Sequence, residues 1–284
     1  MPEVESLAVF LRERCVGRVI ARVELTAFSA LKTYDPPLSA LHGLEIDGVE
    51  RHGKYLDLSA QGLHLVFHLA RAGWLRWRDN LPETPAKPGK GPLALRVRLD
   101  DDSGFDLTEA GTQRKLAVHV VADPNDIAMV ATLGPDPLSP DFDEAALQAL
   151  LTHAGRSQLK GVLKDQRIIA GIGNAYSDEI LHAARLSPFK PSSTLTPEEL
   201  HTLHQAVRDE LGRAIARAEG LAAKDLKGEK KSGLRVHGRT GQACDVCGDT
   251  IAGVSFADSS LQYCPTCQTG GKKLADRRLS KLLK

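Results

Sequence analysis

The chain has 284 residues, 42% hydrophobic content and a formal net charge of +1. It is long enough to bury a core in one to three domains, and its overall charge does not by itself announce a polyanionic partner. No apolar run approaches the ~18 residues of a membrane span, and the N-terminus lacks a hydrophobic secretory core. We therefore expect a cytoplasmic protein with no membrane partner, in which disulfides are rare.

The first half of the sequence predicts a helix followed by a β domain. Residues 4–15 carry apolar side chains at helical spacing, Gly17 ends the run, and Cys15 is expected to be buried on this helix. Short segments that alternate or are rich in β-branched residues follow, punctuated by Gly, Pro and Asp, which is typical of a β-sandwich or barrel. The expected strands fall within 19–25, 43–53, 55–59, 63–69, 73–78, 93–99, 104–108 and 116–121.

A proline-rich stretch, LGPDPLSP at 133–140, predicts a domain boundary. Helical patterns follow it, and Asp141 and Thr196 are candidate N-caps because each precedes glutamates. We expect a β domain at 1–132, a helical domain at 133–234 and a cysteine module at 235–284. The helical patterns cover 141–155, 157–169, 174–186 and 196–220.

Four of the five cysteines form two CxxC pairs. Cys244 and Cys247 are followed by sixteen residues and then by Cys264 and Cys267. Two pairs at this separation are typical of a four-thiolate zinc site, which is structural because it keeps no open position. A redox dithiol pair is the alternative. We expect one structural Zn²⁺ that supplies folding free energy, with a β-hairpin in the spacer and its tip at 257–260.

A glycine turn, AGIGN, separates two helical patterns. Gly171 and Gly173 allow a tight turn, and Asn174 then starts the next helix. Exposed N–H groups at a helix N-terminus, together with an asparagine cap, can bind phosphate. An ordinary capped glycine turn is the alternative. The basic C-terminal segment, with twelve Lys or Arg against six Asp or Glu over 224–284, favours a clamp on a nucleic-acid backbone.

Pro2 follows the initiator methionine, and two hypotheses stay open for it. A processed N-terminal proline carries a secondary amine, which is substantially neutral near cell pH and can attack a sugar aldehyde carbon. Proline equally suits the first turn of a helix, where its missing N–H would be unpaired anyway. Glu3 has the same two options, as a proton-donating acid or as an anion favoured at a helix start.

The chain resembles the formamidopyrimidine-DNA glycosylase and endonuclease VIII family over nearly its whole length. The resemblance rests on PEVES, HGKYLDL, LGPDPLS, the helix–two-turn–helix stretch at 160–188 and the CxxC finger. It implies an α+β fold: an N-terminal helix with a β-sandwich domain, a helical helix–two-turn–helix domain and a C-terminal four-cysteine zinc-finger β-hairpin. It also implies a monomer that binds double-stranded DNA at a lesion or abasic site, flips the damaged base, cleaves its glycosidic bond and nicks the strand through a Schiff base on the N-terminal proline.

The resemblance assigns roles to individual residues. Lys54 matches the family lysine near the proline and the phosphate, and Arg114 matches the arginine that fills the gap left by the flipped base, with Leu116 as the adjacent wedge. His68 and Asn174 match residues that contact phosphates. The expected catalytic residues are Pro2, Glu3 and Lys54, and the expected DNA-binding residues are His68, Arg71, Arg114, Asn174, Arg239 and Ser259.

Several positions depart from the family pattern. Arg71 stands where the family has a wedge methionine, and Ser259 stands where the zinc finger has a phosphate-gripping arginine. Aligned without gaps, Pro2 and Glu3 fall on the second of the family's two Pro-Glu pairs. Two further hypotheses follow: a protein that binds damaged or distorted DNA without excising a base, and a glycosylase for an unusual lesion.

The family segment that contacts the everted base corresponds to residues 213–234. This segment has no readable specificity code, so the sequence names no lesion. Its Lys- and Gly-rich composition predicts mobility in the absence of DNA. A plain linker to the finger is the alternative.

Overall fold

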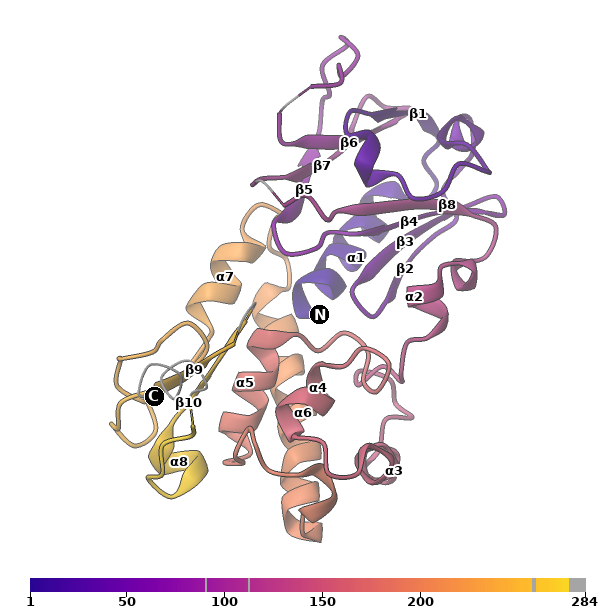
Figure 1. Ribbon diagram of the computed structural model, residues 1–284. Helices are drawn as coiled ribbons and strands as arrows, with labels where there is room; N and C mark the ends of the chain where they lie inside the picture. The colour runs from indigo at the N-terminus through magenta and orange to yellow at the C-terminus, as the bar shows by residue number, and fades with distance from the viewer. Residues whose placement is uncertain (90, 112, 257–258, 276–284) are drawn as a thin grey trace. The chain divides into compact units, whose positions relative to one another are not determined.

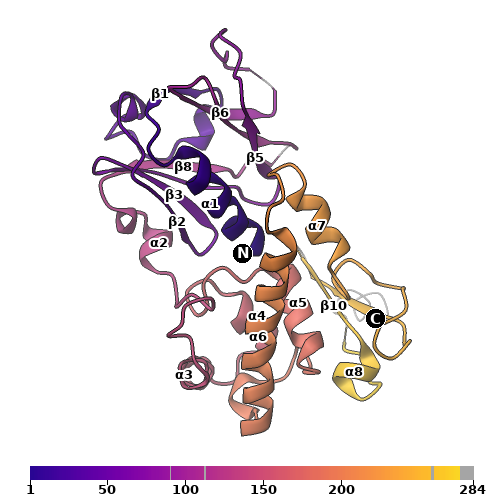
Figure 2. The same ribbon diagram turned by 180° about the vertical axis from the view of Figure 1, so that it is seen from behind.

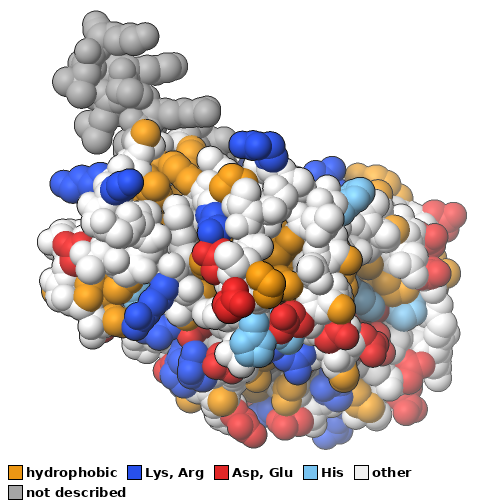
Figure 3. Space-filling model, turned by 90° about the horizontal axis from the view of Figure 1, so that it is seen from below, with side chains coloured by type: hydrophobic (Ala, Val, Ile, Leu, Met, Phe, Trp, Pro, Cys, Tyr) orange, Lys and Arg blue, Asp and Glu red, His pale blue; other side chains and the backbone are white. Residues whose placement is uncertain are grey.

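The chain falls into two units in the computed structural model, which describes residues 1–89, 91–111, 113–256 and 259–275 (Figure 1). One unit, here called the β unit, comprises Pro2–Thr132 and Ala218–Lys227. The other, the helical unit, comprises Met1, Leu133–Arg217 and Gly228–Lys284. Among the described residues, no helix combines the length and apolarity needed to cross a bilayer. Figure 3 shows acidic and basic side chains intermixed on the face seen from below.

The β unit contains helix α1 (Pro2–Cys15) and two antiparallel four-stranded sheets, ordered β1-β6-β7-β5 and β2-β3-β4-β8. Each expected strand segment coincides with one observed strand, and β3 and β7 extend one residue beyond the expected ends, so the strand predictions are confirmed. The strands are β1 (Ile20–Leu25), β2 (Gly48–His52), β3 (Tyr55–Ala60), β4 (Leu63–His68), β5 (Gly73–Arg78), β6 (Leu93–Leu99), β7 (Gly104–Glu109) and β8 (Ala117–Val121).

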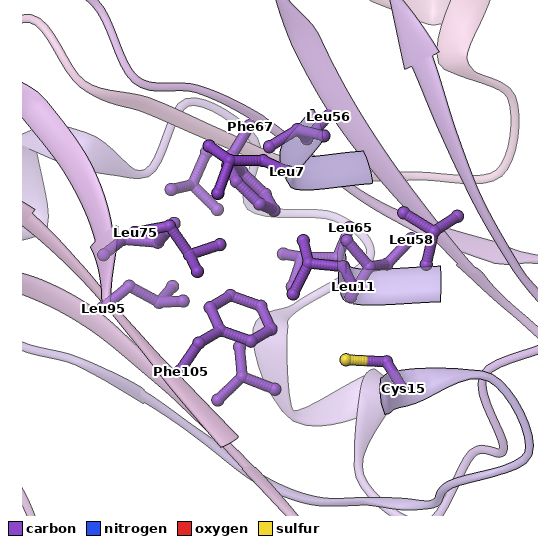
Figure 4. Close-up of a cluster of buried hydrophobic side chains, with 14 of the residues drawn as sticks. Leu7, Leu11, Cys15, Leu56, Leu58, Leu65, Phe67, Leu75, Leu95 and Phe105 are labelled. Carbon is purple, nitrogen blue, oxygen red and sulfur yellow. The ribbon is translucent and has the colours of Figure 1, made fainter. Parts of the chain in front are cut away.

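Apolar side chains from both sheets and from α1 form the core of the β unit. Leu7 and Leu11 of α1 lie among side chains of β3, β4, β5, β6 and β7 (Figure 4). Cys15 is fully buried in this core, as expected. Because one face of each sheet is apolar, packing the two faces together removes both from water, which is the main stabilising term of a sandwich.

The helical unit is built around α6 (Pro197–Ala218), whose whole length is visible from behind (Figure 2). Thr196 and Glu199 form a reciprocal capping box at its start, which confirms Thr196 as a cap. The prediction for Asp141 is wrong: Asp143 caps α3, because its side chain accepts the N–H of Ala146. The other helices are α3 (Glu144–Ala154), α4 (Leu159–Lys164), α5 (Asn174–Ala183), α7 (Leu226–Ser232) and α8 (Pro265–Thr269).

The cysteine module forms the expected hairpin, from β9 (Ala252–Ser255) and β10 (Ser260–Tyr263). Of its expected tip, residues 257 and 258 lie outside the described residues. Short helices at 28–30, 38–41, 124–126 and 128–131, together with α7 and α8, were not expected. Each is seven residues or shorter. A helix of one or two turns contains too few residues for helical spacing of apolar side chains to be recognised in the sequence.

Segment 218–227 joins the two long stretches of the helical unit yet packs into the β unit. Ala218, Ala223 and Leu226 are buried in the β core. The indole Nε1 of Trp74 donates a hydrogen bond to the carbonyl oxygen of Ala223 at 2.9 Å. Part of the stretch expected to be mobile is therefore held by apolar burial and a backbone hydrogen bond.

Candidate functional site

The four cysteines of the finger come together in the helical unit. Their sulfur atoms all lie within 4.8 Å of one another, with 3.4 Å between Cys247 and Cys264 and 3.9 Å between Cys244 and Cys267. A tetrahedral zinc ion with Zn–S bonds of about 2.3 Å separates its sulfurs by roughly 3.8 Å, so the arrangement fits this ion. No disulfide joins any of the five cysteines, all of which are described.

The pKa values of Cys247, Cys264 and Cys267 shift in different directions, and a hydrogen bond with the Asp249 backbone lowers that of Cys247. Burial raises the pKa of Cys264 to about 11 and raises that of Cys267. Thiols with raised pKa values stay protonated at neutral pH unless a metal ion displaces the protons. Zn²⁺ would hold all four as thiolates and would complete a module whose own apolar cluster is small.

Helix α5 lies beside the finger and carries polar side chains to it (Figure 1). The carboxylate of Glu179, which is 2% exposed, accepts three backbone N–H groups, from Arg235, Val236 and His237. Asp178 is fully buried and accepts from the His237 ring at 2.7 Å. Acidic side chains that look solvent-facing in the sequence are therefore the groups that dock the finger.

His182 continues the same helix face and reaches the metal ligands. Its Nε2 lies 3.3 Å from the sulfur of Cys244, and the ring is 3% exposed. Burial, with a smaller contribution from the charge of Arg235, lowers the pKa of His182. Sequence analysis missed this residue. Its spacing of eight residues from Asn174, two helical turns, was the available signal.

Asn174 is the first residue of α5, as expected, but its side chain does not cap the helix. Gly173 occupies the N-cap position and offers no side chain. Instead, the amide Nδ2 of Asn174 donates to the carbonyl oxygen of Ser260 in the finger hairpin at 2.7 Å. The amide nitrogen carries a second N–H besides the one that donates to Ser260.

A buried ammonium supports the start of α5. Nζ of Lys160, on α4, donates to the carbonyl oxygen of Asn174, to Ser177 and to Asp178, at 2.6–2.7 Å. Burial lowers the pKa of Lys160, while Asp178 acts in the opposite direction. Three short bonds satisfy all three protons of the ammonium group, so Lys160 ties α4 to the first residues of α5 rather than facing solvent.

In the β unit, Lys54 lies in the two-residue turn between β2 and β3. His52 and Tyr55 pair across this turn, and Gly53 adopts a φ of +59° that favours glycine. The guanidinium of Arg51 donates to the Gly53 carbonyl oxygen at 3.1 Å. Lys54 is half-buried. The HGKYL motif thus folds into a tight hairpin that fixes the base of the lysine side chain.

His68 ends β4 directly opposite Tyr55. The N–H of Ala70 donates to Nδ1 of the imidazole at 3.0 Å. Burial, followed by the charge of Lys54, lowers the pKa of His68 to about 4. The ring is therefore neutral at cell pH with its proton on Nε2, which makes it a hydrogen-bond donor suited to a phosphate oxygen.

Pro2 and Glu3 form the first turn of α1, and both are buried. The nitrogen of Pro2 is acylated by Met1, so it is an amide and becomes an amine only when Met1 is removed. Met1 is 5% exposed and packs in the core of the helical unit, against Gly171. Gly171 has a φ of +83°, a conformation that L side chains rarely adopt, which explains the glycine there.

Arg71 and Arg114 occupy loops of the β unit and are exposed. The guanidinium of Arg114 donates to the carbonyl oxygen of Gly91 at 3.0 Å. The expectation that Leu116 is a wedge is wrong, because this side chain is 2% exposed and belongs to the core. The carboxylate of Glu109 accepts the N–H of Leu116 at 3.0 Å and turns the chain inward.

Arg239 and Ser259 lie in the finger. The guanidinium of Arg239 forms a two-pronged ion pair with Asp245, between the first two cysteines, at 2.5 and 2.9 Å. It also donates to the carbonyl oxygen of Arg235, so its contacts brace the first CxxC turn. Ser259 closes the hairpin loop, because its carbonyl oxygen accepts the N–H of Phe256 at 2.8 Å.

Two further features of the β unit were not expected. The residues that line a cavity of about 670 Å³ include Trp74, Arg76, Trp77 and 222–224. On the sheet β2-β3-β4-β8, the buried carboxylate of Asp57 joins His52 at 3.0 Å and His64 at 2.9 Å. The hydrogen bond to Asp57 raises the pKa of His52.

Comparison with known proteins agrees with this architecture. Residues 1–118 match the formamidopyrimidine-DNA glycosylase N-terminal domain, 133–225 match the H2TH domain of the same glycosylase, and 241–270 match a zinc finger found in FPG and IleRS. The formamidopyrimidine-DNA glycosylase of Symbiobacterium thermophilum is 37% identical over 98% of this chain and 92% of its own length. This chain belongs to the formamidopyrimidine-DNA glycosylase family.

A shorter curated protein and a solved complex with DNA are also similar to this chain. An uncharacterized formamidopyrimidine-DNA glycosylase-like protein of Mycobacterium tuberculosis is 58% identical over 152 residues, which cover 54% of this chain and 94% of that protein. The Lactococcus lactis enzyme in complex with DNA containing FAPY-dG has a TM-score of 0.82 and 27% identity, over 94% of this chain and 99% of that one. The family fold and the four-cysteine finger are thereby confirmed.

Proposed function

We propose that this protein is a DNA repair glycosylase with associated lyase activity, which excises a damaged base, most simply an oxidised one, and nicks the strand at the resulting abasic site. Family membership supports the substrate class. The observation that carries the proposal is the strand register that brings Lys54 near His68: Tyr55, the residue after Lys54, pairs directly with His68 across β3 and β4. Burial, followed by the lysine charge, keeps the imidazole neutral. A cation and a neutral N–H donor together suit a phosphate next to a reacting sugar.

An amine is the nucleophile in this proposal. The secondary amine of Pro2, released by removal of Met1, attacks C1′ of the flipped nucleotide as the glycosidic bond breaks and the base leaves with a proton supplied by Glu3. The attacking nitrogen loses its proton, and the C1′–O4′ bond then breaks as O4′ takes up a proton, which opens the sugar ring and leaves an iminium between the nitrogen and C1′. The iminium loses a proton from C2′, and the 3′ phosphate departs by elimination. Lys54 is the alternative amine.

The helical unit supplies the grip on DNA. Asn174 offers its second amide N–H at the start of α5, where the aligned peptide dipoles also favour an anion. Arg239 and Ser259 belong to the finger that α5 supports. Because contacts to phosphates carry no sequence information, we propose that this grip is independent of base sequence and weakens steeply with salt.

The test is borohydride trapping of the full chain on duplex DNA with an abasic site. Reduction fixes the iminium, and mass spectrometry of the adduct then identifies the amine. We expect the sugar on Pro2, and a sugar on Lys54 would reassign the nucleophile. Lys54→Ala should lose excision and strand nicking far more than stability, whereas Lys32→Ala, which removes another lysine of the β unit, should keep both.

A second candidate function is recognition of damaged DNA without excision. It is favoured by the departures from the family pattern at Arg71 and Ser259. Binding to lesion-containing DNA with no trapped adduct on any abasic or oxidised-base substrate would select this function. Salt-independent binding would count against both candidates, because each needs the phosphate clamp.

A further inference from the structure

His182 connects helix α5 to the metal ligands of the finger. Its Nε2 is 3.3 Å from the Cys244 sulfur, within the range of an N–H···S hydrogen bond. Its other ring nitrogen, Nδ1, is buried and has no hydrogen-bond partner among the described residues. A buried polar atom without a partner costs free energy, so this ring is placed for the contact on its opposite side.

The direction of the hydrogen bond follows from proton placement. A neutral imidazole carries one proton. On Nδ1, that proton would leave a buried donor without a partner and would turn the Nε2 lone pair toward a sulfur anion. On Nε2, it gives the sulfur a donor and leaves only an unused lone pair. The protonated ring would also carry a proton on Nε2, so Nε2 is the donor in either state.

We propose that His182 is a positioning residue of the zinc site, which holds the Cys244 thiolate through Nε2–H and thereby links metal retention to helix α5. Hydrogen bonds from the outer shell of a metal site orient the ligands and strengthen metal binding. The usual outer-shell partners are carboxylates and carbonyl groups that accept from a ligating histidine. Here the roles are reversed, because a histidine outside the site donates to a ligating cysteine.

Helix α5 contacts the finger at further positions besides His182. Asn174 and His182 are eight residues apart, about 12 Å along the helix axis. Asn174 donates to the hairpin backbone at Ser260, and His182 contacts the first CxxC turn at Cys244. Asp178 and Glu179, between them, hold the finger through backbone N–H groups. If the Cys244 thiolate dissociated from zinc, its hydrogen bond with His182 would weaken. This bond is one of several that join the finger to the face of α5 that begins with Asn174.

The test exploits the geometry of amide side chains. The Nε2 of glutamine lies as many bonds from Cα as the Nε2 of histidine, whereas the Nδ2 of asparagine lies one bond short. His182→Gln should therefore retain the donor, while His182→Asn and His182→Phe should lose it. We expect zinc transfer to a chromogenic chelator to be at least ~10-fold faster for the Asn and Phe variants and within about 3-fold of the parent for Gln.

A second readout separates the hydrogen bond from general destabilisation. In Co²⁺-substituted protein, the thiolate-to-metal charge-transfer bands should shift in His182→Asn and stay close to the parent in His182→Gln. His201→Asn is the matched control, because His201 is an exposed histidine of the same unit whose partner is Glu144. Its release rate should not change. Equal release rates for the Gln and Asn variants, or parental rates and spectra for Asn, would overturn the proposal. If the Phe variant does not fold, the comparison of His182→Gln with His182→Asn still tests the proposal.

Discussion

His68 and Tyr55 occupy directly opposed positions on β4 and β3, and their ring centroids are 4.8 Å apart. The phenol ring covers the imidazole, which is one reason why burial dominates the titration of His68. The pair stands at the end of the hairpin that carries Lys54. A neutral histidine at this place keeps an N–H donor without adding a second positive charge beside the lysine.

The first prediction concerns pH. The pKa of His68 is about 4 in the folded protein, against roughly 6.5 when unfolded. Below pH 6.5 the unfolded chain takes up a proton that the folded chain refuses, so this group costs stability progressively as pH falls from 6.5 to 4, by up to ~1.4 kcal/mol per pH unit. Above pH 6.5 it contributes no pH dependence.

His68→Asn should flatten this part of the profile. The Oδ1 of asparagine takes the place of Nδ1 as acceptor for the Ala70 N–H, and the amide does not titrate. The measurement is the free energy of unfolding in urea between pH 4.5 and 7.5. His153→Asn, at an exposed position of the helical unit, is the control and should leave the slope unchanged. A parental slope in His68→Asn would contradict the lowered pKa.

The second prediction concerns the buried ion pair between Lys160 and Asp178. Lys160→Met leaves a fully buried carboxylate without its cation, and breaking a buried pair in this way costs about 3–5 kcal/mol. Lys190→Met is the matched control. The Lys190–Glu199 pair has the same 2.6 Å separation but is partly exposed. Lys190→Met should therefore lower the free energy of unfolding by no more than about 1 kcal/mol. Equal losses in urea unfolding would rule out a burial effect.

The third prediction concerns the two tryptophans. Trp74→Phe removes the indole N–H that donates to the Ala223 carbonyl oxygen. We expect the free energy of unfolding to fall by about 1–2 kcal/mol and amide exchange across 218–227 to become faster. Trp77→Phe is the control, because its indole N–H bonds to the exposed side chain of Asp79. It should leave exchange in 218–227 unchanged. Unaltered exchange in Trp74→Phe would mean that apolar burial alone holds this segment.

The fourth prediction concerns the metal. Elemental analysis should find one zinc ion per chain, bound by Cys244, Cys247, Cys264 and Cys267. Chelation should remove amide protection within 235–275 and leave the β unit protected, since the apolar cluster of the finger is too small to fold it alone. A metal-free preparation with full protection, or a Cys264→Ser protein with parental stability and DNA binding, would refute it.

The sequence was most informative where a period or a spacing repeats. Each strand of the β unit was visible as an alternating or β-branched run, because half of its side chains had to face the core. The CxxC spacing predicted the thiol cluster, since four ligands of one ion must converge. The turn at Lys54 followed from a glycine between two strand patterns.

The contacts around α5 could not be predicted in the same way. Asp178, Glu179 and His182 read as the polar face of an amphipathic helix, and only the docked finger turns that face into a buried one. Leu116 shows the opposite error. A resemblance placed it at a wedge position, whereas the turn made by Glu109 directs it into the core. Local sequence specifies which residues are polar, and tertiary packing decides which of them water reaches.

Segment 218–227 makes the β unit discontinuous along the chain. A fragment that stops at Thr132 would lack Ala218, Ala223 and Leu226, and a gap would open in its apolar core. A fragment that begins at Leu133 would keep these side chains with no core to enter. Neither half is a self-sufficient folding module. For protein engineering, grafting the β unit onto another scaffold therefore means transplanting two pieces of chain together, and a circular permutant that joins them is the natural starting design.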